Sequence, residues 1–195
     1  MAKWDNLLLF KKNSAEDYLK TAQNVAAWLK KYEVKKLVGK SWEIRSGAGS
    51  DEGDDLASKM TDRSIYSGAA GIGFFYIQLY EATDDKQYLD EAVEAAEYLL
   101  GTFQKELGVK PGIHGGITGE GFFAETLYQK TGEQKYRDYA IQVGDVAYET
   151  AVKEDGKIHW DNLVDYMGDG STAVYWLQLA EITGDQKYVT YAKEL

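Results

Sequence analysis

The sequence predicts an all-α fold built from tandem helical hairpins. Three segments of the 195-residue chain, at 68–92, 116–140 and 168–192, align with one another without gaps. Each segment begins at a glycine, and each places a Thr-Asp or Thr-Gly turn between two runs of apolar residues at helical spacing. The segments repeat after 48 and 52 residues, which is long enough for two helices and their connections. Hairpins of this kind bury their apolar faces against neighbouring hairpins.

The chain before the first repeat predicts a single helix over 14–38. Tyr18 and Ala22 reproduce the spacing of the apolar residues in the second helix of the first repeat. Ser14, with Asp17 three residues later, matches the S-x-x-[DE] pattern that caps a helix N-terminus. We therefore expect an outer helix that lacks its inner partner.

Each repeat predicts two antiparallel helices joined by a tight turn. The first helix runs from the glycines to a threonine, and the turn combines a residue that ends one helix with an acid that caps the next. We expect the hairpins at 68–105, 117–154 and 169–195. We expect their first helices to form one inner layer, at 68–83, 117–131 and 169–183. The third hairpin stops within its second helix, so the chain is expected to be one partial domain, 1–195, of a longer protein.

Composition and charge exclude several classes of function. The chain has 22 basic and 32 acidic residues and a net charge of −10, with no clustered basic run, so nucleic acid is not an expected partner. It has no cysteine, which excludes disulfides and thiolate zinc sites. No apolar stretch approaches the about 20 residues that a membrane-spanning helix needs. No signal-peptide cleavage pattern is present, so a cytoplasmic location is expected by default, and export stays open for a chain whose signal peptide was removed.

Two strings within the repeats carry a resemblance to a known family. YSGAAGIG at 66–73 and TGDQKY at 183–188 resemble the repeat signature of the lanthionine synthetase C-like family, and the resemblance extends from about residue 65 to the end of the chain. It implies an (α/α) toroid of about six or seven hairpins, in which Gly-rich inner-helix starts surround a central cavity. This chain would be the N-terminal part of such a toroid, an incomplete ring.

The same resemblance implies a chemistry. The cyclases of the family hold zinc through two cysteines and one histidine, and they activate a peptide thiol for addition to a dehydroamino acid. Because this sequence has no cysteine, zinc is expected only in a longer native protein, and this chain is expected to hold no cofactor. The resemblance therefore implies a cyclase-related domain that binds a peptide substrate in the cavity and is inactive in this form.

Four residues near the inner-helix starts are candidates for catalysis: His114, Glu120, Asp165 and Asp169. A histidine can act as a general acid or base near neutral pH. His114 precedes a Gly-rich element as a family histidine does, with one residue more, and Asp165 lies next to the position of a family aspartate. Two of the carboxylates could also face each other across a cavity, as in a glycoside hydrolase. The alternative for each is structural, since backbone groups can satisfy a loop histidine and helix N-termini favour acids without any function.

Five further residues are candidates for contact with a substrate: Tyr66, His159, Trp160, Asp161 and Tyr166. They lie in the connections that lead to the inner helices, so we expect them on one rim of the cavity. Aromatic rings with a polar tip are suited to stacking on a sugar or a peptide. Two histidines and an acid on one rim could hold a metal, but their spacing is not that of a metal motif, and we expect no metal site.

Three functions therefore stay open. The first is a lanthionine synthetase C-like domain that binds a peptide, and the second is a carbohydrate-active toroid hydrolase with paired carboxylates that binds an oligosaccharide. The third is a helical-repeat module that binds a partner without catalysis, and fold alone does not separate the three. We also expect self-association through the C-terminal edge, because Val174, Leu177 and Leu179 face a helix that stops at Leu195.

Overall fold

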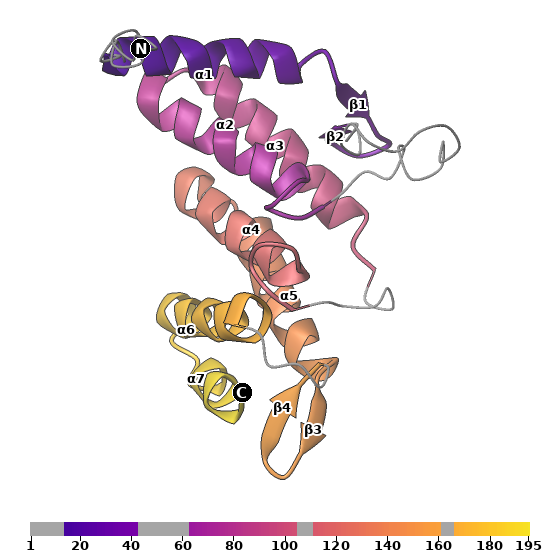
Figure 1. Cartoon of the computed structure of the whole chain (residues 1–195). Coiled ribbons are helices and arrows are strands. Elements are labelled where there is room, and N and C mark those ends of the chain that lie inside the picture. The colour runs from indigo at the N-terminus through magenta and orange to yellow at the C-terminus, as the bar shows by residue number, and fades with distance from the viewer. Residues whose placement is uncertain (1–13, 43–62, 105–110, 161–165) are drawn as a thin grey trace, which may run out of the picture. The chain divides into compact units, whose positions relative to one another are not determined.

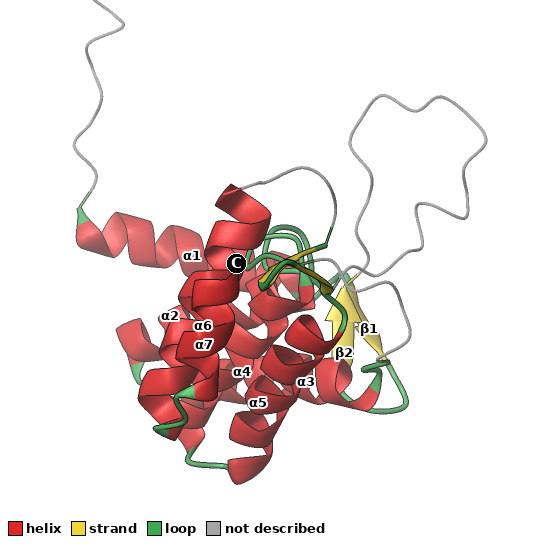
Figure 2. Ribbon diagram, turned by 90° about the horizontal axis from the view of Figure 1, so that it is seen from below, coloured by secondary structure: helices red, strands yellow, loops and turns green. Residues whose placement is uncertain are grey.

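The structure is a computed structural model that describes residues 14–42, 63–104, 111–160 and 166–195. The chain divides into two compact units, residues 1–32 and residues 33–195. The larger unit consists mainly of helices, with two short pairs of strands among its described residues (Figures 1 and 2). No helix in the described part of the chain is long and apolar enough to span a membrane.

The smaller unit contains helix α1, Ala15–Leu29. Its N-terminus is closed by a capping box, in which the Asp17 amide donates to the Ser14 hydroxyl at 3.1 Å and the Ser14 amide donates to the Asp17 carboxylate at 2.9 Å. The hydrogen bonds from Ser14 lower the pKa of Asp17. The predicted cap is therefore confirmed, and the assignment of α1 as an outer helix stays a prediction.

Three helical hairpins form most of the larger unit, as the predicted fold class requires. Their bounds are α2, Ala69–Thr83, with α3, Lys86–Gly101; α4, Ile117–Thr131, with α5, Gln134–Glu149; and α6, Ser171–Thr183, with α7, Lys187–Glu194. Figure 1 shows the three hairpins one after another along this unit. The all-α fold of tandem hairpins, an incomplete (α/α) toroid, is confirmed.

The turn within each hairpin is built in the same way. A residue with positive φ follows the first helix, namely Asp84 at 56°, Gly132 at 71° and Gly184 at 73°. The threonine before it donates its hydroxyl to the carbonyl of the leucine four residues earlier. The same hydroxyl accepts a hydrogen bond from the amide two residues later. The repeated threonines of the sequence are therefore structural parts of these turns.

Helices α2, α4 and α6 lie next to one another in that order, as the predicted inner layer requires. The ring centre of Phe74 on α2 lies 5.4 Å from that of Phe122 on α4. Gly121 on α4 leaves room for Tyr175 on α6, because a Cβ at Gly121 would lie 1.9 Å from the Tyr175 hydroxyl oxygen. Close approach of neighbouring helices therefore explains this glycine.

The apolar side chains of the third hairpin are only partly covered. Leu179 was predicted to lie at an uncovered edge, but it is buried, as are its equivalents Leu79 and Leu127 in the earlier hairpins. Val174 and Leu177 were predicted at the same edge, and they are 52% and 49% exposed. The uncovered surface is therefore smaller than the sequence predicted.

The helix predicted over 14–38 was wrong beyond Leu29. Residues Glu33–Lys35 form strand β1, which pairs antiparallel with strand β2, Lys40–Trp42. Gly39 in the turn has a φ of 67°, a left-handed conformation that a continuous helix does not contain. The strands therefore replace the last part of the predicted helix.

Contacts with α3 explain why this ribbon forms. The Lys40 ammonium lies 2.9 Å from the Glu91 carboxylate of α3 and 3.3 Å from that of Glu33 on the paired strand. A Cβ at Gly39 would lie 2.3 Å from the carbonyl oxygen of Glu94 on the same helix. Such tertiary contacts override local helix propensity.

The second hairpin also ends earlier than predicted. Its outer helix was expected to reach residue 154 but stops at Glu149, and strands β3, Val152–Glu154, and β4, Lys157–His159, follow as an antiparallel ribbon. Asp155 and Gly156 between them have φ values of 50° and 75°, as a two-residue hairpin turn requires. A short π-helix, Tyr166–Gly170, then leads into α6.

Candidate functional site

The turns that lead into the inner helices are joined by hydrogen bonds. The Tyr66 amide donates to the His114 carbonyl at 2.8 Å, which links the turn before α2 to the turn before α4. The Gly112 amide donates to the Thr172 hydroxyl at 2.8 Å, and the Ile113 amide donates to the Ser171 hydroxyl at 2.9 Å. We call this linked surface, made of 63–68, 111–116 and 168–172, the rim.

Two glycines let the rim turns fold back over their own helices. A Cβ at Gly71 would lie 2.0 Å from the carbonyl oxygen of Ile65, and a Cβ at Gly119 would lie 2.0 Å from that of Ile113. Both glycines stand at the same place in their repeats, so the same close contact is made twice. Packing within the rim therefore explains these glycines.

Glu120, a predicted catalytic residue, is buried in the first turn of α4 with 3% of its surface exposed. Arg63 donates to both of its carboxylate oxygens, from Nε at 2.9 Å and from Nη2 at 2.6 Å. The Tyr139 hydroxyl on α5 donates to the same carboxylate at 2.5 Å. The carboxylate thus joins the rim turn at 63–68 to α4 and α5.

Arg63 is held on several sides. Its Nη2 also donates to the Leu99 carbonyl at 2.7 Å, and its Nη1 donates to the Thr102 hydroxyl. Burial lowers the pKa of Arg63, but the ion pair with Glu120 outweighs it and raises the pKa above its ordinary value. Burial and the Glu120 charge likewise raise the pKa of Tyr139. The guanidinium therefore stays charged and the phenol stays neutral.

The position of Glu120 has a matching role in the third repeat. Thr172 stands at the equivalent place on α6, and it accepts its hydrogen bond from Gly112 in the preceding rim turn. Glu120 in the same way accepts from Arg63 in its preceding rim turn. This geometry gives Glu120 a structural task in coupling hairpins, and its predicted catalytic role stays a prediction.

Tyr66 and His114 are the predicted site residues that the rim brings together at its surface. Both are exposed, and 83% of the surface of Tyr66 is accessible. Their backbones are bonded directly to each other. The rim therefore carries an exposed phenol and an exposed imidazole on two hydrogen-bonded turns.

Trp160 and His159 follow a different pattern. The Trp160 indole donates to the Ala147 carbonyl on α5 at 3.2 Å, and its ring centre lies 5.9 Å from that of Trp176 on α6. His159, at the end of β4, has its Nε2 atom 3.9 Å from the Glu154 carboxylate on β3. Both are half-buried. Trp160 therefore packs on the hairpins, which weakens the case for ligand stacking.

Of the remaining predicted residues, the structure describes those in the short helix before α6. Asp169 is half-buried in the π-helix, and Tyr166 is the first residue of that helix. Asp161 and Asp165 lie outside the described residues. Their proposed roles stay predictions.

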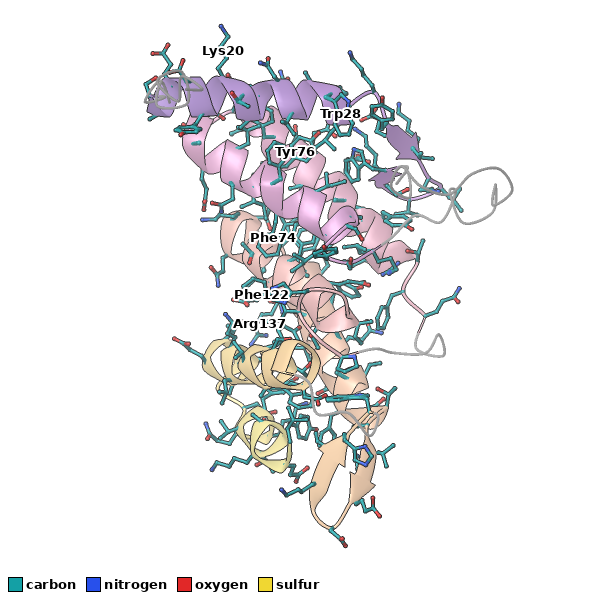
Figure 3. All side chains as sticks on the ribbon, viewed as in Figure 1. Lys20, Trp28, Phe74, Tyr76, Phe122 and Arg137 are labelled. Carbon is teal, nitrogen blue, oxygen red and sulfur yellow. The ribbon has the colours of Figure 1, made fainter. Side chains whose placement is uncertain are left out.

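Residues at equivalent positions of the inner helices form a second surface. Three rows of equivalent residues cross α2, α4 and α6 there, and each member is half-buried or exposed. The rows are Phe74, Phe122 and Val174; Gln78, Thr126 and Gln178; and Glu81, Gln129 and Glu181. Figure 3 shows Phe74 and Phe122 close together on neighbouring helices. We call this surface the layer face.

The sequence alone did not reveal Arg63 as a site residue. It lies before the aligned repeats, so no periodic signal marks it. Its pairing with Glu120 spans 57 residues of sequence. Tyr139 lies within a repeat, but it is one of many tyrosines with core-like spacing.

The described residues do not fit the zinc site of the family. No three or more His, Cys, Asp or Glu side chains among them are grouped so as to hold a metal. The chain has no cysteine, and the oxygens of Glu120 already accept hydrogen bonds from Arg63 and Tyr139. The expected absence of a cofactor stays a prediction.

Comparisons with known proteins agree with this architecture. A family model described as lanthionine synthetase C-like protein matches residues 59–195. No curated protein matches the chain. The GH76A α-1,6-mannanase from Salegentibacter sp. HEL1_6 has a similar structure, with a TM-score of 0.64 and 18% sequence identity. An inactive variant of that mannanase in complex with α-1,6-mannotriose gives the same values.

The mannanase likeness covers 91% of this chain but 49% of the mannanase chain. The chain therefore spans about half the length of that enzyme. At 18% identity, the likeness shows the fold alone.

Proposed function

Because the chain belongs to the lanthionine synthetase C-like family, we propose that it forms a peptide-binding part of an α/α toroid. The rim supports this proposal most directly, because it presents Tyr66 and His114 together on turns that are hydrogen-bonded to each other. Tyrosine offers an apolar ring and a polar tip, which suits contact with a peptide. Histidine can donate and accept hydrogen bonds and can transfer a proton.

The layer face would extend this contact beyond the rim. Its aromatic row, Phe74 and Phe122, offers apolar surface, and the exposed amide of Gln78 offers groups that can pair with peptide N–H and C=O groups. Helices pack about 8–10 Å apart, and an extended peptide advances about 3.3 Å per residue. A peptide that crosses α2, α4 and α6 would therefore place about every third residue over a new helix.

Within this proposal, His114 is the residue that moves a proton, because its side chain is exposed on the rim. Arg63 and Glu120 position the rim turn that carries Tyr66. Asp169, just before the third inner helix, would assist His114, and His159 would contact the substrate. The roles predicted for Asp161, Asp165 and Tyr166 rest on the sequence alone.

An oligosaccharide is the second candidate ligand. The observation in its favour is the fold shared with an α-1,6-mannanase whose inactive variant binds α-1,6-mannotriose. Aromatic rings with neighbouring amides and carboxylates on the layer face would also suit a sugar. A hydrolase would need two facing carboxyl groups, and Glu120 is engaged by Arg63.

Selection from a random dodecapeptide phage library on the immobilised chain tests the proposal. A selected peptide is then titrated by fluorescence anisotropy, with α-1,6-mannotriose titrated in parallel by calorimetry. We expect peptide binding that Tyr66→Ala weakens about tenfold, which corresponds to about 1.4 kcal/mol. Val152→Ala, an exposed residue on β3, is the matched control and should bind normally. Binding of mannotriose alone would favour the second candidate, and binding of neither would refute both.

Two further properties stay predictions. A cytoplasmic location follows only from the default expectation for such a sequence. Self-association through the C-terminal edge is supported by the exposure of Val174 and Leu177. Light scattering over a range of concentrations would test it, and a strict monomer at high concentration would count against it.

A further inference from the structure

Successive inner helices interlock by inserting an aromatic ring into a glycine notch. A Cβ at Gly73 on α2 would lie 2.2 Å from the ring of Phe123 on α4. A Cβ at Gly121 on α4 would lie 1.9 Å from the hydroxyl of Tyr175 on α6. Gly73 and Gly121 are equivalent in the repeat, and so are Phe123 and Tyr175, and both rings are fully buried. The hairpins therefore stack in one repeated register.

A second set of equivalent positions reports whether a following helix is present. Ile77 on α2 is 0% exposed, and Glu125 on α4 is 6% exposed. Leu177, their equivalent on α6, is 49% exposed. The first two helices are followed by another inner helix in the same layer, whereas α7 is the one described helix after α6 and is its outer partner. The side of α6 that carries Leu177 is therefore exposed, whereas the equivalent sides of α2 and α4 are covered.

The notch on α6 differs from the other two. Its position is occupied by Ala173, which is half-buried, in place of the two glycines. The Cβ of Ala173 stands where a Cβ would collide with the ring in both earlier notches. A ring inserted in the same register would have to move away, so a smaller side chain fits this position better.

We propose that Ala173, Val174 and Leu177, here called the α6 edge, bind the inner helix of a further helical hairpin. That helix carries a small residue at the place where Phe123 and Tyr175 stand in their own helices. The register of the α2–α4 and α4–α6 contacts continues onto the α6 edge, which argues for a hairpin of the same kind. The mannanase of the same fold is about twice as long as the part that this chain matches.

The first test uses the absence of cysteine, which makes a single introduced thiol a clean probe. Leu177→Cys is labelled with a maleimide in dilute solution, next to Val152→Cys, whose native residue is also 49% exposed. We expect similar labelling rates for the two variants. Strong protection of Cys at 177 at a concentration where light scattering finds a monomer would show that the chain itself covers the α6 edge, and it would overturn the proposal.

The second test supplies the hairpin. Leu195 is equivalent to Val143 in the second repeat, so a copy of residues 144–195 joined after Leu195 continues the repeat in register. The added copy either keeps Tyr175 or carries Tyr175→Ala. The original chain, here called the host, either keeps Ala173 or carries Ala173→Gly, so four extended proteins are compared. In two of the four extended proteins, we expect the thiol at 177 of the host to be labelled at least about tenfold more slowly than in the unextended chain. These are the copy with alanine on the native host, and the copy with tyrosine on the Ala173→Gly host.

The copy with tyrosine on the native host should give little protection. Equal protection there and on the Ala173→Gly host would refute selection for a small residue. No protection in any combination would show that the α6 edge does not bind a hairpin. If Tyr175→Ala prevents the copy from folding, as judged by helix content, the comparison of the two tyrosine constructions still decides.

Discussion

Glu125 provides the sharpest test of how the hairpins pack. It lies on α4 with 6% of its surface exposed, at the place that Ile77 and Leu177 hold in the other repeats. Gln129 Nε2 donates to its carboxylate at 2.5 Å. Burial raises the pKa of Glu125, the hydrogen bond from Gln129 opposes this, and the Glu181 charge adds to it. A carboxylate therefore stands where the repeat otherwise places an aliphatic side chain.

Replacement by Glu125→Leu should stabilise the protein. An inadequately compensated buried polar group costs about 1–3 kcal/mol, and the hydrogen bond from Gln129 recovers part of that. We therefore expect a gain of about 1–2 kcal/mol in the free energy of unfolding at pH 8. For a chain of this size, each kcal/mol corresponds to a rise of about 2–4 °C in Tm. Gln129 is exposed and can bond to water once the carboxylate is gone.

The gain should depend on pH in a definite direction. The ordinary pKa of this carboxyl is 4.5, and it is raised in the folded state, so the folded protein binds the proton more tightly than the unfolded chain. The stability from this group is fully present below pH 4.5 and is lost as the pH rises through the folded-state pKa. The advantage of Glu125→Leu should accordingly be larger at pH 8 than at pH 5.5.

Urea unfolding at the two pH values measures this effect. Glu125→Gln keeps an acceptor for Gln129 and removes the titration, so its stability relative to Glu125→Leu should not change with pH. Glu149→Leu, at the exposed end of α5, is the control and should change stability by less than about 0.5 kcal/mol. A loss of stability in Glu125→Leu at both pH values would refute the reasoning, because it would mean that the carboxylate makes a net favourable contact.

Three other experiments have expected outcomes. Arg63→Met should destabilise the fold by about 3–5 kcal/mol in urea unfolding, because it leaves the Glu120 carboxylate buried without its partner, whereas Arg63→Met with Glu120→Leu should recover much of the loss. Gly121→Ala should lower stability by about 1–3 kcal/mol through its clash with Tyr175, whereas Gly115→Ala, where a Cβ meets nothing within 4 Å, should be neutral. Elemental analysis after dialysis against a chelator should find no stoichiometric zinc; retained zinc would show that His114 and His159 were misjudged.

The hairpins could be predicted from the sequence because each repeat contains the same residues at the start and end of its inner helix. The glycines that start the inner helices and the threonines that end them recur at fixed intervals, and the structure uses them in the same way each time. The helix ends after α1 and α5 were missed for a different reason. A two-residue turn such as Asp155-Gly156 outweighs helical spacing in the flanking residues, and the ribbon at Gly39 depends on contacts with α3.

The site was predicted less well, because its contacts cross between repeats. Tyr66 and His114 could be placed near inner-helix starts from the sequence, but the bond between their backbones depends on how neighbouring hairpins stack. Glu120 was recognised as a carboxylate at a helix start, whereas its partner Arg63 lies 57 residues away in a segment outside the repeats. A sequence pattern of one period cannot identify such a partner.

Two buried glutamates on α4 show why departure from a repeat does not by itself reveal its consequence. Glu120 and Glu125 both replace apolar or neutral residues at their equivalent positions, and both are at least nine-tenths buried. Glu120 meets a guanidinium and a phenol that occupy its oxygens, so removing Arg63 leaves an uncompensated buried charge. Glu125 accepts a hydrogen bond from an exposed glutamine and has a second acid nearby, so removing its charge relieves a cost. The same departure from the repeat thus predicts opposite changes in stability, and the partner supplied by the neighbouring hairpin determines the sign.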